Sequence, residues 1–119
     1  MNRLWFTFLI LLITSPLWAY NASNRLCWNA NSEADLAGYG VHVGNLSGNY
    51  NVIPSLDVQK TTTPTAPCIT LGSLKLHDGT YYTVVSAYDN SGNRSGYSSE
   101  VRVPLDQSPP VAVGGVRVE

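Results

Sequence analysis

The sequence predicts an all-β fold, a sandwich of two antiparallel sheets. Several short runs have a period of two, as expected when successive strand side chains point to opposite faces, most clearly residues 39–44, where Tyr39, Val41 and Val43 alternate with Gly40, His42 and Gly44. Prolines and glycines separate these runs, which is typical of a chain of short strands. Outside the first 19 residues no segment has the 3.6-residue period of an amphipathic helix. A single all-β domain is therefore expected.

The first 19 residues have the layout of a secretory signal peptide. Arg3 supplies the positive charge, residues 4–13 are apolar except for Thr7, and residues 14–19 form a cleavable end. We expect cleavage after Ala19. The apolar run is well short of the ~20 residues that a membrane-spanning helix needs. The protein is therefore predicted to be secreted, periplasmic or held at the cell surface, with no membrane span after cleavage.

The mature chain, residues 20–119, has the size of one domain and is slightly acidic. The full sequence has 7 Lys and Arg against 8 Asp and Glu; without Arg3 the balance is 6 against 8, a net charge near −2. Nucleic acids and anionic membranes are recognised through basic patches. We therefore expect neither as a partner.

The first two strands carry large core residues. Leu26 and Trp28 share a face of the first strand, and the tryptophan is large enough to anchor a small core. In the second strand, residues 39–44, the apolar residues beginning with Tyr39 lie on one face and His42 lies on the other.

Four more strands follow. Residues 50–58 are irregular and contain Pro54, which suits the edge of a sheet. Residues 69–74 mark the next strand and its exit. The stretch 78–104 reads as a long hairpin of two strands joined by a polar turn. Six strands at this spacing are expected for a β-sandwich.

Several motifs together resemble a fibronectin type III domain, an immunoglobulin-like sandwich. They are Leu-x-Trp at 26–28, Asp-Leu-Ala-Gly-Tyr-x-Val at 35–41, Leu74 followed by Asp-Gly-Thr-Tyr-Tyr at 78–82, and Ala-Tyr-Asp-x-x-Gly-Asn-x-Ser at 87–95. The resemblance covers residues 26–103 and implies a domain over 20–104. Its first strand would be short or missing, because only residues 20–25 remain for it.

The resemblance also implies roles for four core residues. Trp28 would lie on the family's second strand, and Tyr39 and Leu74 would lie in the core. Tyr81 would be the tyrosine-corner residue, whose hydroxyl bonds back to the preceding turn. Tyr82 is the alternative for that role, because the turn could shift by one residue.

Cys27 and Cys68 are the only cysteines. By alternation both point away from the core, and an exported protein lies in a compartment where disulfides persist. The family architecture places their two strands side by side and antiparallel. The resemblance therefore implies a cross-strand disulfide between them.

The residues do not assemble a catalytic or zinc centre. His42 and His77 are the only histidines, and no serine has a nucleophile signature. A zinc site would need three or four closely spaced ligands. We therefore expect a protein that is not an enzyme and has no cofactor.

The hairpin turn has part of the spacing of a calcium loop. Asp89, Ser91, Asn93 and Glu100 fall at relative positions 1, 3, 5 and 12. Arg94 stands where the sharp bend requires glycine, and the flanks are strands rather than helices. An ordinary polar turn is therefore expected.

Tyrosines near the loops indicate a binding surface, because they give rigid, amphipathic contact area. Cross-strand aromatic pairs also simply stabilise exposed sheets, so this alternative stays open. The candidate residues of this binding surface are Tyr82, Tyr88, Asn93, Arg94 and Tyr97. Tyr39 is counted with them as an outward tyrosine.

Residues 105–119 form a tail that contains proline and glycine. It is either a flexible tail or the opening of another repeat. Alternatively, Val111–Val118 folds back along the incomplete sheet edge or donates a strand to a neighbour.

We expect a non-catalytic binding or spacer module that contacts an extracellular protein or polysaccharide. One alternative is a structural unit that self-associates through its incomplete edge strand. The other is a truncated piece of a larger secreted enzyme or adhesin.

Overall fold

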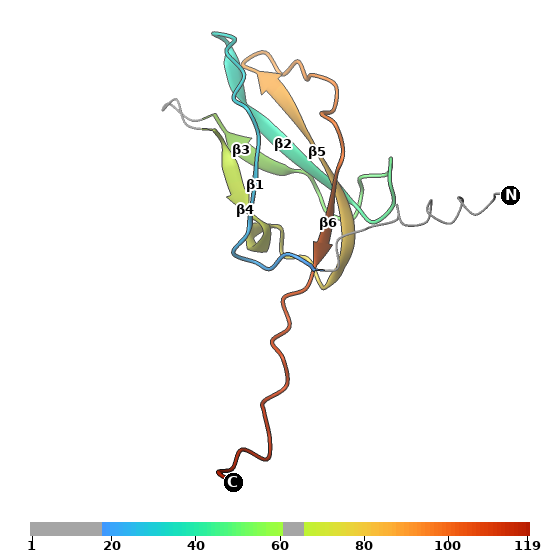
Figure 1. The fold of residues 1–119 in the computed structure, drawn as a ribbon. Coiled ribbons are helices and arrows are strands. Elements are labelled where there is room, and N and C mark those ends of the chain that lie inside the picture. The colour runs from blue at the N-terminus through green and yellow to red at the C-terminus, as the bar shows by residue number, and fades with distance from the viewer. Residues whose placement is uncertain (1–17, 61–65) are drawn as a thin grey trace, which may run out of the picture.

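Six strands form two antiparallel sheets in the computed structural model, which describes residues 18–60 and 66–119 (Figure 1). The larger sheet has the order β3-β2-β5-β6, and the smaller consists of β1 and β4. The strands are β1 (Arg25–Cys27), β2 (Leu36–Gly44), β3 (Leu56–Gln59), β4 (Cys68–Thr70), β5 (Gly79–Asp89) and β6 (Val101–Leu105). The all-β prediction with two antiparallel sheets is confirmed. The expected signal peptide lies outside the described residues, apart from 18–19.

The two long strands β2 and β5 form the centre of the larger sheet. They pair antiparallel from Leu36 opposite Asp89 to Gly44 opposite Tyr82. The predicted irregular strand before residue 60 shortens to the four residues of β3, which lies at the sheet edge as expected. After β4 the chain turns into a short 3₁₀ helix, η1 (Leu71–Leu74), whose two leucines are buried.

The core lies between the two sheets. Val41 and Val43 of β2 are fully buried, and residues of η1 and β6 close around them. The side chains on the small-sheet side of the core are less covered: Leu26 and Ile69 of this sheet, and Trp28 directly after β1, are only partly buried. Two strands therefore cover a four-stranded sheet incompletely.

The predicted core residues fall at two depths. Tyr39 and Leu74 are buried, whereas Trp28 and Tyr81 are partly buried against the core. The Tyr81 hydroxyl donates a hydrogen bond to the His77 carbonyl at 2.8 Å. This bond leads back to the turn before β5, and it belongs to Tyr81 rather than to Tyr82.

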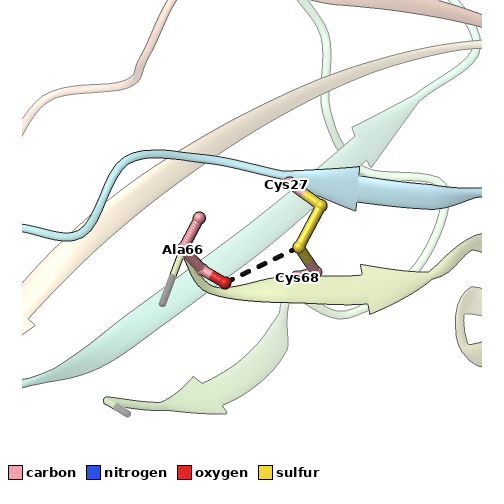
Figure 2. The surroundings of a disulfide bond; sticks show 3 residues. All are labelled: Cys27, Ala66 and Cys68. Carbon is pink, nitrogen blue, oxygen red and sulfur yellow. Dashed lines mark hydrogen bonds between the residues drawn. A yellow bond between two sulfur atoms is a disulfide. The ribbon is translucent and has the colours of Figure 1, made fainter. Parts of the chain in front are cut away.

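The disulfide between Cys27 and Cys68 is present, which confirms the prediction (Figure 2). The two residues stand directly opposite each other in the β1–β4 pair. The bond therefore ties the two strands of the small sheet together.

The tail after β6 forms no strand in the part of the chain that the structure describes. The first residues of the tail are held to the domain, because Gln107 donates from its backbone to Asp78 and from its side chain to the Leu76 carbonyl. Beyond Ser108 the chain runs away from both sheets (Figure 1). The interpretation that Val111–Val118 folds back on its own domain is wrong, because its four valines are 83–100% exposed.

Within residues 18–60 and 66–119, no helix has the length and apolar character that crossing a bilayer requires.

Candidate functional site

The outer face of the large sheet is shaped by glycines on β2. Gly38 and Gly40 leave room for large side chains from neighbouring segments to lie across the strand. A Cβ at Gly38 would stand 2.9 Å from the Tyr88 hydroxyl, and one at Gly40 would stand 3.1 Å from Nη1 of Arg94. The two glycines therefore form the floor on which Tyr88 and Arg94 rest.

A polar cluster occupies the middle of this face. His42 Nε2 lies 2.9 Å from Ser86 Oγ, and Nη1 of Arg94 donates to the same hydroxyl at 3.4 Å. The Arg94 guanidinium stacks over the Tyr88 ring, 5.0 Å from its centroid, in a cation–π arrangement. The Tyr88 hydroxyl in turn donates to the Asp57 carboxylate on β3. Arg94 is thus held by two contacts to β5, the Ser86 hydroxyl and the Tyr88 ring.

Tyr97 extends the cluster from His42 toward Tyr50, in the loop after β2. Its ring lies 4.9 Å from the His42 ring and 5.4 Å from the Tyr50 ring, edge to face with the latter. The hydroxyls of Tyr50 and Ser47 donate to Glu100, at 2.6 and 2.7 Å. We call the whole series the outer-face row: Asp57, Tyr88, Arg94, Ser86, His42, Tyr97, Tyr50 and Glu100.

Charge along the row is arranged around one cation. Burial, and then the neighbouring Arg94 charge, lower the pKa of His42, so this ring is neutral at neutral pH. The hydrogen bonds from Tyr50 and Ser47 lower the pKa of Glu100 and keep it ionised. The row therefore presents a guanidinium, flanked by aromatic rings, with a carboxylate at each end.

The row is a surface rather than a cleft. Val84 and Ser86 beneath it are 2% and 3% exposed, whereas Tyr97 is 59% exposed. The Ser86–His42 contact resembles a nucleophile–base pair, but the serine hydroxyl is buried and already accepts from Arg94. Because Ser86 is only 3% exposed, the geometry suits binding better than nucleophilic attack.

A shallow hollow of about 290 Å³ lies beside the row. Trp28 and Tyr39 form part of its wall, and the segment from Ser95 to Ser98 closes one side. This volume is near the lower end of what small-molecule pockets enclose. It is large enough for one side chain or ring of a partner.

Three predicted surface residues, Tyr88, Arg94 and Tyr97, come together in the row. Tyr82 lies on the same face but opposite Gly44, at the other end of β5. Asn93 belongs to the turn, where its side chain donates to Asp89.

Counting Tyr39 among the outward tyrosines was wrong. Its side chain is 2% exposed, and its hydroxyl accepts a hydrogen bond from the Asn31 backbone. Asp57, Tyr50 and Glu100 were not predicted as site residues, because no local pattern marks contacts between segments 31 to 50 residues apart.

The two ends of the suspected calcium loop serve different structures. The Asp89 carboxylate accepts from the backbone N–H groups of Ser91 and Asn93, as in an ordinary polar turn. Glu100 instead binds the loop that contains Tyr50. No group of three or more His, Cys, Asp or Glu side chains with metal-binding geometry occurs in the described ranges.

Gly44→Ala is expected to destabilise the domain by about 1–3 kcal/mol through overpacking. A Cβ there would stand 1.5 Å from the Asn49 carbonyl oxygen, which is backbone and belongs to the loop that positions Tyr50. Chemical denaturation measures the loss. Gly96→Ala is the control, because its Cβ would meet no heavy atom within 4 Å. Equal midpoints for the two variants would contradict the prediction.

Comparisons of the chain with protein-family models, with curated proteins and with solved structures found no match. The fibronectin type III assignment therefore stays a prediction from the sequence motifs.

Proposed function

We propose that the chain is an exported, non-catalytic binding module of fibronectin type III kind, which contacts an extracellular protein or polysaccharide through the outer-face row. The observation that carries this proposal is the fixed, partly exposed group of Tyr97, Arg94 and Tyr88. Each of these side chains is held by a ring or hydrogen-bond contact before any partner arrives. The module would act as a secreted or periplasmic protein, or at the cell surface.

Pre-positioning is the reason to favour binding. Ordering a flexible side chain at an interface costs about 0.5–1.5 kcal/mol, and a side chain already held in place avoids much of that cost. Tyrosine and arginine are also the residues most often found at energetic centres of interfaces. Aromatic faces and a guanidinium suit both sugar rings and protein surfaces.

The fold assignment draws support from three features. These are the two antiparallel sheets, the Tyr81 hydrogen bond to the turn before β5, and the disulfide of the small sheet. The disulfide also fits an oxidising compartment, where such bonds persist.

The test is an array of immobilised glycans and extracellular proteins probed with the mature chain. A ligand found there should bind the double variant Tyr97→Ser, Arg94→Ser at least about tenfold more weakly, as expected for central contact residues. Tyr20→Ala is the matched control, because Tyr20 is 39% exposed and pairs with the body through its backbone. Equal binding by the double variant and the control would show that the ligand does not bind through the outer-face row. An array without any specific signal would count against the binding function itself.

A further inference from the structure

The small sheet leaves one side of the core poorly covered. It has two strands of three residues, and it faces a sheet of four strands. Its core-facing side chains are only partly buried, although Val41 and Val43 of the opposite sheet are fully buried. A third strand beside it would complete the cover.

The edge of β1 that faces away from β4 could pair with such a strand. The backbone N–H of Trp28 donates to the Pro67 carbonyl, and the Asn24 carbonyl accepts from the backbone N–H of Leu71. Every second residue along β1 and its flanks therefore bonds toward β4. By the antiparallel pattern, the N–H and C=O groups of Arg25 and Cys27 therefore point to the open side. Both residues are exposed, and in the described chain no strand lies beyond β1 in this sheet. An edge of this kind is a template for strand addition.

The tail has the sequence of a strand with no sheet to join. Val111 and Val113 alternate with Ala112, and after a Gly-Gly pair Val116 and Val118 alternate with Arg117. All four valines are 83–100% exposed, which is unusual for β-branched apolar side chains in an alternating pattern.

Gly115 resolves a mismatch between the two halves of this segment. The valine positions change from odd to even across the glycine pair, so a regular strand would point the two halves to opposite faces. One extra residue, in a β-bulge built on a glycine with positive φ, would restore a common face. Gly115 has φ +65°. All four valines can then face one core.

The root of the tail directs it away from its own domain. Ser108 is held to Asp78 by its hydroxyl at 2.7 Å, and Pro109 and Pro110 follow at once. A residue before proline favours extended backbone, and so does proline itself, so a tight reversal at this point is disfavoured. Figure 1 shows the tail leading away from both sheets.

We infer that Val111–Val118 of one copy adds as a strand to the free edge of β1 in a second copy of this chain. Backbone hydrogen bonds to Arg25 and Cys27 would hold it, and its valines would cover the core beside Leu26 and Trp28. Reciprocal exchange closes a dimer, and one-way donation builds longer assemblies. This inference is independent of the outer-face row, which lies on the other sheet.

Light scattering of the mature chain during size-exclusion chromatography tests the association. The wild-type chain should elute with at least twice the monomer mass, in a concentration-dependent way. A variant with all four valines changed to serine should be a monomer, whereas the control Ala112→Ser, Arg117→Lys should still associate. A wild-type chain that is a monomer at every concentration overturns the inference.

A peptide titration then tests the edge and the bulge. The four-serine full chain is the acceptor, and synthetic peptides of residues 109–119 are the donors. L-alanine at 115 should weaken binding about 5–30-fold, because an L-residue at positive φ costs roughly 1–2 kcal/mol. D-alanine there should bind like glycine. Acceptor Arg25→Pro, which removes an N–H on the open side, should bind at least tenfold more weakly than the unmodified acceptor. Equal peptide affinity for the Arg25→Pro acceptor and for the unmodified acceptor overturns the assignment to β1.

Discussion

Removing the disulfide is expected to destabilise the domain by about 4 kcal/mol. Cys27 and Cys68 are 41 residues apart, and the chain-entropy account gives this value for a loop of that size. A domain of this length typically has about 5–15 kcal/mol of stability in total, so the loss is large. The melting temperature of the Cys27→Ala, Cys68→Ala variant should fall by roughly 15–30 °C.

The effect has a structural reason beyond loop entropy. The small sheet pairs only three residues of each strand, and its side chains are partly exposed, so few other contacts hold it to the core. Thermal unfolding of the wild-type chain with and without reductant is the measurement. The double-alanine variant is the control, because reductant has no bond to break in it. A wild-type melting temperature that reductant leaves unchanged would contradict the prediction.

Tyr39→Ala is expected to cost about 3–5 kcal/mol, as truncations of large buried aromatic residues do. Tyr39 is 2% exposed and meets the Trp28 ring edge to face at 5.4 Å. Its hydroxyl accepts from the Asn31 backbone N–H at 2.8 Å. One side chain thus joins β2, the residue after β1 and the connection between them.

Tyr39→Phe separates the two contributions. It keeps the ring in the core and removes only the hydrogen bond, so a loss of about 1–3 kcal/mol is expected from the unpaired Asn31 N–H. Chemical denaturation of both variants, with Tyr20→Ala as an exposed control, measures the difference. Equal losses for the alanine and phenylalanine variants would show that ring packing contributes little.

Much of the fold could be predicted from local pattern. Alternation indicated most of the strands, since the period of two is imposed by the strand backbone itself. The irregular region 50–58 narrowed to Leu56–Gln59 in the structure. Pro54, inside the predicted strand region 50–58, indicated an edge position, because proline lacks the donor that a central strand needs, and β3 lies at the sheet edge. The paired cysteines followed from facing and from the family resemblance. Strand ends were less exact: β2 begins at Leu36, and β6 runs to Leu105.

The candidate site was predicted only in part. Tyr88, Arg94 and Tyr97 were marked by their residue types near a turn, but their partners were not. The contacts to Asp57 and Tyr50 cross 31 to 50 residues of chain and depend on how β3 and the loop after β2 lie against the sheet. The sequence predicted only that His42 lies on the face opposite the apolar residues of its strand. In the structure Tyr97 lies against its ring and the side chain is half-buried.

The sequence by itself determined the strands, their facing and the capacity for one disulfide, because backbone alternation and residue chemistry act over a few neighbouring positions. Only the tertiary structure decided which tyrosines are covered, which side chains share the outer-face row, and that the valine-rich tail leaves its own domain. Those outcomes depend on packing between segments far apart in the chain. No local period records such contacts, since they form only when both sheets are in place.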